Sequence, residues 1–219
     1  QYFDTGVIGK SYTKAEIDFT AEAWPAHGTH IFGSKGTKIV APWYYNYGVG
    51  LYYESKLINS YQHANLGIRY KIVTTCEPNN QTVFWVDSGK IFKTSDGSHS
   101  PWSGTTDRPM YIFALNDNGT PVLSGGILRL YGMKVWQKDS ADGEYALIRD
   151  YRPAVKDGRN CLYDDVNKTL IYPKAADGSE TTIAPTIRRV YSTTHDGMTP
   201  IQQLTNAVAS AVAGDIIVL

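Results

Sequence analysis

Hydrophobic and polar residues alternate along most of the first 173 residues of this chain. The clearest run is KAEIDFTAEAW (residues 14–24), in which Ile17 and Phe19 fall on one face and three carboxylates fall on the other. A period of two is typical of a β-strand that has one face against a hydrophobic core. We therefore expect this segment to be a strand that points Ile17 and Phe19 into the core.

Ten further strands are predicted by the same kind of pattern. In chain order they are TKIVAPWYY (37–45), GVGLYYE (48–54), LGIRYKIVTT (66–75), TVFWVD (82–87), KIFKT (90–94), PMYIFALN (109–116), GILRLYGMKVWQK (126–138), EYALIRDYRP (144–153), CLYD (161–164) and KTLIYP (168–173). Tight turns rich in Gly, Asn and Asp separate them, and VDSGK is typical of a hairpin turn. Pro153 is expected to end its strand at a sheet edge. Many short strands joined by tight turns predict an all-β fold, an antiparallel β-sandwich.

The pattern changes to helical spacing after about residue 185. In MTPIQQLTNAVASAVAGDIIVL, Thr199 is a suitable N-cap, Pro200 suits the first helical position, and Gly214 is the residue expected just after the helix. DIIVL then predicts one apolar strand. A lone helix and strand bury little surface, so we expect them to begin a further domain of a longer protein. The expected divisions are a sandwich over 1–175, a linker over 176–195, and a cap helix with a first strand over 196–219.

Charge excludes two classes of partner. The 21 Lys and Arg residues balance the 21 Asp and Glu residues, so no basic excess exists to neutralise nucleic-acid phosphates. The signs alternate along the chain, which argues against a polybasic membrane patch. No apolar run reaches the roughly 18 residues that a transmembrane helix needs. We expect neither a nucleic-acid partner nor a transmembrane segment.

The chain has two cysteines, Cys76 and Cys161, and no CxxC spacing. This argues against a zinc site or a disulfide-stapled scaffold. We expect two buried free thiols. The alternative is a disulfide between them, which requires that the two strands that carry them are neighbours. The five histidines show no spacing typical of metal ligands. No metal site and no cofactor are therefore predicted.

Several of these segments together resemble a known family. MYIFALNDNG (110–119), GGILRLYGMKVWQKD and ALIRDYRPAVKDGRNCLYDDVNKTLIYP are similar to the laminin G/pentraxin-like branch of the concanavalin A-like lectin/glucanase superfamily. YFDTGV and AEIDFTAEA fit its opening strands, so the resemblance covers roughly residues 1–175. The last run is the most specific part, although Cys161 stands where the family has a small residue. The resemblance implies a jelly-roll sandwich of the kind found in large secreted proteins of gut and host-associated bacteria.

That superfamily can also hold calcium. NDNGT (116–120) or KDSADGE (138–144) could supply oxygen ligands, but neither follows the spacing of an EF-hand loop. Ordinary turns are the expected role of both. The tail NAVASAVAGDIIVL is similar to the entry helix and first coil of pectate lyase-type parallel β-helix proteins, which implies a β-helix domain downstream.

Three charged residues of the most specific run are expected to be structural. CLYDDVNKTLIYP predicts a hairpin with the turn DDVNK, and we expect charge-assisted bonds of Arg149, Asp150 and Asp164 to attach it to the sheet. No catalytic role is assigned to them.

The three carboxylates of KAEIDFTAEAW raise the question of catalysis. Catalytic members of the superfamily carry E-x-D-x-E or E-x-D-x-x-E, whereas this chain has E-x-D-x-x-x-E. Six steps of roughly 3.3 Å place Glu16 and Glu22 about 20 Å apart, beyond the ~5–9.5 Å that glycoside hydrolysis needs. Glu16 and Asp18, at about 6.6 Å, could suit an inverting pair, but the enzymes place their motif in mid-chain. No catalytic residue is therefore predicted.

Aromatic residues are the best candidates for ligand binding. A sugar ring stacks its C–H bonds on an aromatic face, and its hydroxyls need polar partners. The run APWYYNYGVGLYY and the loop SHSPWSGTTD supply such rings, although alternation along a strand leaves about half of them for the core. The candidate ligand-binding residues are Trp43, Tyr45, Tyr47, Tyr52 and Trp102.

The sequence thus predicts a non-catalytic carbohydrate-binding or adhesion module of a larger secreted or cell-surface protein. Its expected partners are a polysaccharide or glycan and the downstream domain of the same chain. One alternative is a structural spacer without a small ligand. A second is a β-sandwich glycoside hydrolase in which Glu16 and Asp18 act.

Overall fold

The computed structural model describes residues 1–24, 29–35, 41–45, 48–53, 56–63, 65–77, 80–87, 90–96, 107–123 and 125–181. The chain forms two compact units, residues 1–185 and residues 186–219, and all described residues belong to the first. The expected C-terminal helix and strand, and the β-helix that they imply, lie outside the described residues and stay predictions.

Within the described residues the chain forms seventeen β-strands and no helix. They are β1 (Phe3–Ile8), β2 (Thr13–Ala23), β3 (Thr29–His30), β4 (Phe32–Lys35), β5 (Ala41–Tyr45), β6 (Gly48–Tyr53), β7 (Lys56–His63), β8 (Arg69–Glu77), β9 (Asn80–Asp87), β10 (Lys90–Asp96), β11 (Pro109–Ile112), β12 (Ala114–Asp117), β13 (Thr120–Leu123), β14 (Ile127–Gln137), β15 (Ala146–Lys156), β16 (Arg159–Asp164) and β17 (Thr169–Ile171). The predicted all-β class is confirmed. The alternation did not reveal β1, β3, β4, β7 or β13, and of these only β1 was expected from the family resemblance.

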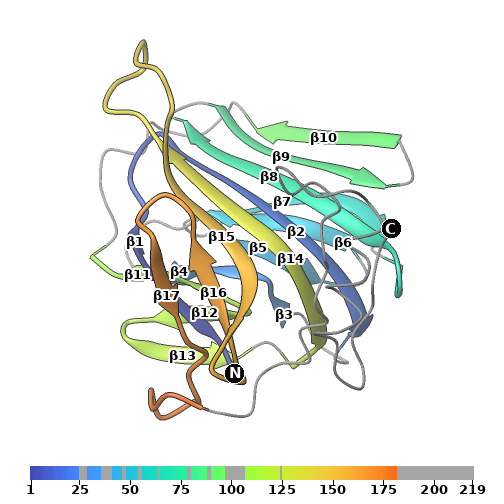
Figure 1. The fold of residues 1–219 in the computed structure, drawn as a ribbon. Helices are drawn as coiled ribbons and strands as arrows, with labels where there is room; N and C mark the ends of the chain where they lie inside the picture. Colours follow the sequence, from blue (N-terminus) through green and yellow to red (C-terminus); the bar gives the residue numbers. More distant parts are fainter. Residues whose placement is uncertain are drawn as a thin grey trace, which may run out of the picture. The chain divides into compact units, whose positions relative to one another are not determined.

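Three sheets contain these strands. The largest has the order β10-β9-β8-β2-β14-β15-β16-β17, the second has the order β1-β11-β4-β12-β13, and the third has the order β3-β5-β6-β7 (Figure 1). All strand pairs are antiparallel except β4 with β12. The core residues Ile17, Phe19 and Ile72 come from the eight-stranded sheet, and Phe3, Phe32 and Ile112 come from the five-stranded sheet. The fold is a β-sandwich, as the sequence predicts.

β2 shows why the alternation in its sequence was informative. Ile17 and Phe19 have no exposed surface, whereas Glu16 and Asp18 are half-buried on the opposite face. The predicted core face is therefore confirmed. Thr20 departs from the pattern because it is buried on the polar face, where its hydroxyl donates to the Tyr131 hydroxyl at 3.3 Å.

The prediction of one strand over residues 109–116 is wrong. The chain bends at Phe113, which has a φ of 63°, and its N–H donates to the Ile31 carbonyl at 2.7 Å. β11 and β12 therefore lie on opposite sides of β4, one antiparallel to it and one parallel. A non-glycine residue with positive φ is rare, and here a bond between distant segments holds it.

The prediction that Pro153 ends its strand is also wrong. β15 continues to Lys156 and pairs with β16 throughout this stretch, with Pro153 opposite Leu162. The pairing of β14 with β15 stops at Tyr151. Because the missing N–H of Pro153 lies beyond this point, it breaks no bond to β14, and the proline is tolerated inside the strand.

Two predicted turns use residues that accept positive φ. Asn118 (53°) and Gly119 (93°) connect β12 to β13, and Asp157 (53°) and Gly158 (73°) connect β15 to β16. Asn-Gly and Asp-Gly pairs suit two-residue hairpin loops because both loop positions need this conformation. Both turns are confirmed.

The question left open for the two cysteines is settled for Cys161. Its thiol is buried and free, in β16. Cys76 lies in β8, so β2, β14 and β15 separate the two strands. Four strand spacings of about 4.8 Å are far beyond the reach of a disulfide. Burial raises the pKa of the Cys161 thiol, which keeps it protonated.

Candidate functional site

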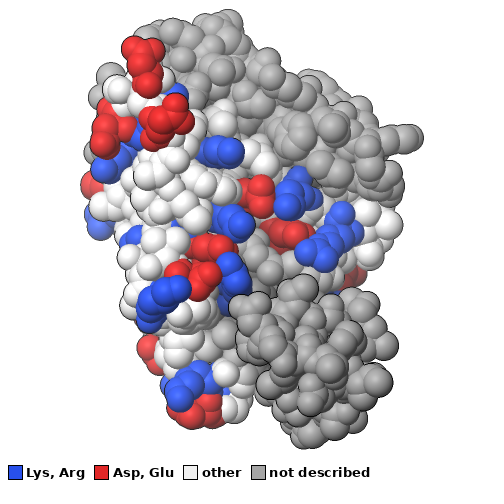
Figure 2. Space-filling model, turned by 45° about the horizontal axis from the view of Figure 1, so that its top comes forward, with Lys and Arg blue, Asp and Glu red and all other residues white. Residues whose placement is uncertain are grey.

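One face of the eight-stranded sheet points away from the core and carries a dense set of charged side chains. We call it the outer face. It consists of Glu16, Asp18 and Glu22 on β2, Arg69 and Lys71 on β8, Arg129, Tyr131, Lys134 and Trp136 on β14, and Asp150 and Arg152 on β15. On the face that Figure 2 shows, the positive and negative side chains of the described residues are interspersed.

Every β2 carboxylate of the outer face contacts a cation from a neighbouring strand. Asp18 accepts two hydrogen bonds from Arg69, at 2.7 Å from Nε and 2.8 Å from Nη2. Glu16 lies 3.2 Å from Nζ of Lys71. Glu22 pairs with Arg129 of β14, the strand that flanks β2 on the side away from β8. The hydrogen bonds that Arg69 donates to Asp18 raise the pKa of Arg69, so the guanidinium stays charged.

The structure therefore answers the question raised by KAEIDFTAEAW. Glu16, Asp18 and Glu22 do share one face, as their spacing predicts, but each is an acceptor in a contact with a cation. These contacts fix the carboxylates as oriented hydrogen-bond acceptors. Each oxygen still has lone-pair capacity for a further donor.

The aromatic ring of Tyr131 contacts one of these ion pairs. The Arg69 guanidinium lies over its ring, 4.2 Å from the ring centroid, and the Thr20 hydroxyl donates to its hydroxyl. The pairing of β14 with β2 shifts at this position, between Leu130 and Gly132. A β-bulge of this kind re-aims a side chain. The bulge explains how Tyr131 reaches the outer face beside Asp18.

Sequence reasoning missed Tyr131, although the sequence contained a signal for it. In GILRLYGMKVWQK, the buried positions are even-numbered at first, Leu128 and Leu130, and odd-numbered afterwards, Met133 and Val135. A change of phase in the middle of a strand indicates a bulge. The bulge lies at Tyr131.

A second aromatic group lies at the end of β14. Lys14 stands over the Trp136 ring at 4.8 Å and over the Tyr145 ring at 5.9 Å. Lys138 stands over Tyr145 at 4.9 Å and over Tyr12 at 5.3 Å. All three rings are half-buried. Cation–π contacts of this type hold the rings in fixed orientations at the surface.

The aromatic candidates from the sequence fall mainly in the four-stranded sheet. The register of β5 with β6 places Trp43 opposite Gly50, Tyr45 opposite Gly48, and Tyr52 opposite Ala41. Directly opposed residues share a face, and so do alternate residues of one strand. The backbone thus brings Trp43, Tyr45 and Tyr52 to one face of that sheet. Tyr47 and Trp102 lie outside the described residues.

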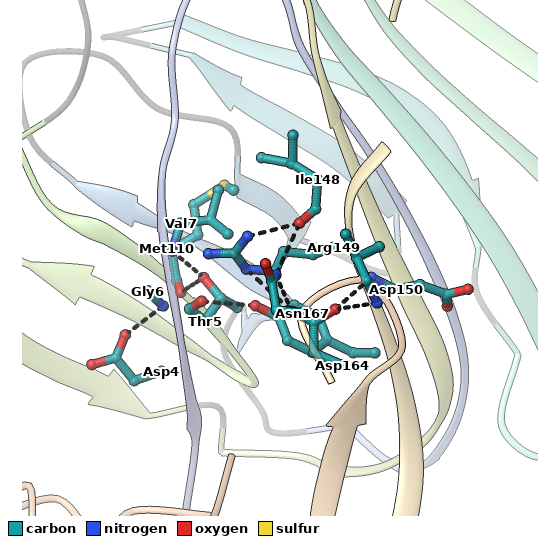
Figure 3. Close-up of polar contacts among 12 residues, drawn as sticks. Asp4, Thr5, Gly6, Val7, Met110, Ile148, Arg149, Asp150, Asp164 and Asn167 are labelled. Atoms are coloured by element: carbon teal, nitrogen blue, oxygen red, sulfur yellow. Dashed lines mark hydrogen bonds and ion pairs between the residues drawn. The ribbon is translucent and has the colours of Figure 1, made fainter. Parts of the chain in front are cut away.

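The expected structural role of the Asp164 region is confirmed. One oxygen of Asp164 accepts from the backbone N–H groups of Asp150 and Val166, both at 3.1 Å. The other accepts from Nδ2 of Asn167 at 2.6 Å and lies 3.4 Å from Nε of Arg149 (Figure 3). We call these five residues the hairpin anchor. They attach the β16–β17 turn to β15.

The hairpin anchor continues into the core through Tyr151. Its hydroxyl donates to the Thr5 carbonyl at 2.7 Å, which links the eight-stranded sheet to the five-stranded sheet. The Thr5 hydroxyl in turn donates to the Met110 carbonyl at 2.6 Å (Figure 3). Burial raises the pKa of Tyr151 above its ordinary value of 10. This chain of bonds makes the region structural.

The two loops considered for calcium form turns. The Asn116 side chain accepts from the Gly119 N–H at 2.7 Å, and the Gly143 N–H donates to the Ser140 carbonyl at 3.2 Å. Among the described residues, no group of three His, Cys, Asp or Glu side chains is placed to hold a metal ion. The sequence prediction of no cofactor, with calcium left open by the superfamily resemblance, stays untested.

No protein-family model matches this sequence, and no curated protein matches it. Among solved structures, the chain is similar to the native heptameric SAP-like pentraxin from Limulus polyphemus, with a TM-score of 0.41 and 10% identity. The similarity covers 67% of this chain and 84% of that chain. A likeness of this size shows neither a shared ligand nor a shared activity. In the part of the chain that the structure describes, no helix is long and apolar enough to cross a membrane.

Proposed function

We propose that this chain is a non-catalytic carbohydrate-binding module and that its outer face binds a polysaccharide. One observation carries the proposal. The Asp18–Arg69 pair and the Tyr131 ring form a single contact group on the solvent side of the sheet. An oriented carboxylate, a guanidinium and an aromatic ring are the groups that a sugar needs, since it presents both hydroxyls and C–H faces.

The ion pairs favour binding because they fix the side chains in advance. A mobile Arg or Asp side chain would lose about 0.5–1.5 kcal/mol of rotamer freedom when a ligand immobilised it. The bidentate contact between Asp18 and Arg69 holds both side chains before a sugar arrives. Hydrogen bonds from sugar hydroxyls to a carboxylate are charge-assisted and therefore stronger than neutral ones.

The same contacts argue against the hydrolase alternative. A glycoside hydrolase needs one carboxylic acid that protonates the leaving oxygen and a second carboxylate that acts on the other side of the bond. Here Glu16 and Asp18 each accept from a cation of β8. Two carboxylates engaged in this way suit recognition better than proton delivery.

The aromatic residues predicted from the sequence remain part of the proposal as a second contact region. Trp43, Tyr45 and Tyr52 support it because their register gives them a common sheet face. Tyr47 and Trp102 remain sequence predictions. The secreted or cell-surface location and the downstream domain also belong to the proposal, which requires no cofactor.

Affinity gel electrophoresis tests the proposal directly. The wild type is run through gels that contain a β-glucan, a xylan, a pectin or a sulfated galactan, beside Tyr131→Ala and Asp18→Asn. Asp157→Asn is the matched control, because Asp157 pairs with Lys156 at 3.7 Å in an exposed turn away from β2. We expect at least one gel to retard the wild type. The two outer-face variants should lose most of this retardation, and the control should be retarded like the wild type.

Two outcomes decide between this proposal and its alternatives. If no polysaccharide retards the wild type, the outer-face proposal is wrong, and the result favours the spacer alternative. If the wild type releases reducing sugar from a β-glucan and Glu16→Gln does not, the hydrolase alternative replaces it.

A further inference from the structure

A shallow pocket of about 330 Å³ lies between β1 and β17, which are edge strands of different sheets. Its lining includes Asp4, Gly6, Ile171, Tyr172, Lys174 and Glu180. Neither the hairpin anchor nor the outer face includes any of these residues. The volume is at the lower end of the range for small-molecule sites.

The backbone around the pocket explains why the space stays open. The pairing of β1 with β11 is irregular between Asp4 and Ile8, where Gly6 has a φ of 64°. The Asp4 carboxylate accepts from the Gly6 N–H at 3.0 Å and so holds this bulge. A Cβ added to Gly6 would meet no atom within 4 Å. The bulge therefore leaves room beside the edge of β1.

The opposite wall is the segment that follows β17. Lys174 and Tyr2 exchange two backbone hydrogen bonds, of 3.1 Å and 2.8 Å, which attach this segment to the N-terminal end of β1. The Thr181 N–H donates to the Pro173 carbonyl at 2.9 Å, which turns the segment back on itself. The pocket thus has two walls that the backbone fixes.

Charged groups of both signs lie at the pocket: Asp4, Lys174 and Glu180 line it, and Arg159 lies beside it. Asp4 lies 3.2 Å from Nζ of Lys174, and Glu180 lies 3.0 Å from Nη2 of Arg159. The two carboxylates and two cations balance, so a charged ligand gains no net attraction. Both carboxylates keep lone pairs, and the Lys174 ammonium has three N–H groups. These are matched donors and acceptors for hydroxyl groups.

The remaining lining supplies an apolar surface. Ile171 and Tyr172 are half-buried at the end of β17. The Arg159 guanidinium lies over the Tyr172 ring, 4.4 Å from its centroid, and so fixes the ring in one orientation. A fixed ring beside balanced polar groups suits a ligand with one C–H face and several hydroxyls.

We propose that this pocket binds one sugar unit of an uncharged glycan. The proposal rests on the carbohydrate-binding function and adds a second site with a narrower ligand class. Hydroxyls of the ring bond to Asp4, Lys174 and Glu180, and its C–H face lies against Tyr172.

Titration of the ¹⁵N-labelled protein with sugars tests this site. The probes are glucose, galactose, mannose, xylose and N-acetylglucosamine, their short neutral oligosaccharides, and glucuronic acid as the charged comparison. The reporters are the backbone amide signals of Gly6 and Lys174. We expect at least one neutral sugar to shift both signals in a saturable way, and glucuronic acid to shift them less. Free sugars and oligosaccharides in separate arms show whether the site takes a lone unit or a unit within a chain.

Two variants and a control complete the experiment. Tyr172→Ala removes the ring contact, and Glu180→Gln removes one charge-assisted hydrogen bond. Each variant should therefore bind roughly tenfold more weakly to the sugar that shifts the wild-type signals. Glu144→Gln carries the same chemical change on an exposed loop and should bind like the wild type. Thermal unfolding confirms that each variant is folded.

Each result separates this proposal from the wider one. If no sugar shifts Gly6 and Lys174, or if both variants bind like the wild type, the pocket proposal is wrong, while retardation in polysaccharide gels can still support the outer face. If sugars shift both amides but no gel retards the protein, the pocket stands and the outer-face proposal fails.

Discussion

Two of the aspartate–arginine contacts in the eight-stranded sheet, Asp164 with Arg149 and Asp18 with Arg69, have the same charges and different surroundings. The Asp164 side chain in the hairpin anchor is 2% exposed, whereas Asp18 on the outer face is 17% exposed and its partner Arg69 is 58% exposed. Asp164 also accepts from Asp150, Val166 and Asn167. The Asp18 contact has the Tyr131 ring beside it, and the side chain of Arg69 is more than half exposed.

The difference shows that an ion pair by itself says little about its role. An exposed pair contributes about 0–1 kcal/mol to stability. Removal of one partner from a buried pair costs about 3–5 kcal/mol, because a charge and several donors are left without partners. The Asp164 contact is therefore expected to serve folding, and the Asp18 contact is available for a ligand.

The largest expected effect is that of Asp164→Ala. The change leaves Arg149 without its carboxylate and leaves two backbone N–H groups without an acceptor. We expect a loss of about 3–5 kcal/mol in the free energy of unfolding, measured by urea denaturation. Asp157→Asn in the next turn serves as the control. A loss below about 1 kcal/mol would place the anchor in the same class as an exposed pair.

The second expected effect concerns the thiol of Cys161, which lies in β16 next to the hairpin anchor. In a Cys76→Ala background, labelling of the native protein by a thiol reagent should be slow, because Cys161 is buried and burial raises its pKa. Asp164→Asn should accelerate labelling by roughly 100-fold if it lowers the opening free energy by about 3 kcal/mol. Asp18→Asn should leave the rate unchanged. Equal labelling rates in Asp164→Asn and Asp18→Asn would mean that the hairpin anchor contributes no more to stability than the Asp18 contact does.

Tyr151→Phe is expected to have a smaller effect. It removes the hydroxyl that donates to the Thr5 carbonyl at 2.7 Å, so we expect a loss of about 1–2 kcal/mol near pH 7. Burial raises the pKa of Tyr151, so its contribution is present below the unfolded value of about 10 and is lost as the pH rises above 10. Urea denaturation at pH 7, 10 and 11 should show a shallower fall in the variant. An identical fall in both proteins would contradict this assignment.

The smallest expected effect is the coupling between Asp18 and Arg69. A double-mutant cycle of Asp18→Asn and Arg69→Gln should give a coupling energy of about 1 kcal/mol or less, which falls further in 1 M salt. The same cycle on Asp164→Asn and Arg149→Gln should give a larger, less salt-sensitive value. Equal couplings would mean that burial does not separate the two contacts.

The sequence predicted the strands better than it predicted their partners. Alternation in β2 assigned Ile17 and Phe19 to the core and placed Glu16, Asp18 and Glu22 on one polar face, and the structure confirms both. These assignments depend only on positions within one strand. The basic partners of the carboxylates lie on β8 and β14, far along the chain, and their positions depend on strand order and register.

The bends were predicted least well, for a similar reason. The run PMYIFALN is apolar without a break, so its pattern gives no sign of the bend at Phe113. That bend depends on a bond to Ile31 from another part of the chain. At Pro153 the error was the opposite one, because the sequence predicts a strand end where the strand continues. A proline normally ends a strand, but Pro153 lies beyond the last residue of β15 that pairs with β14. Local rules fail where a distant segment decides the outcome.

We propose that the outer face binds a polysaccharide, whereas the hairpin anchor holds the fold. The decisive experiment is affinity electrophoresis of Tyr131→Ala beside the wild type, in the polysaccharide gel that retards the wild type most. We expect a marked loss of retardation and a melting temperature within about 4 °C of the wild type, because the half-buried Tyr131 ring lies on the outer face and not in the core. If the folded variant is retarded as strongly as the wild type, the outer-face proposal is wrong.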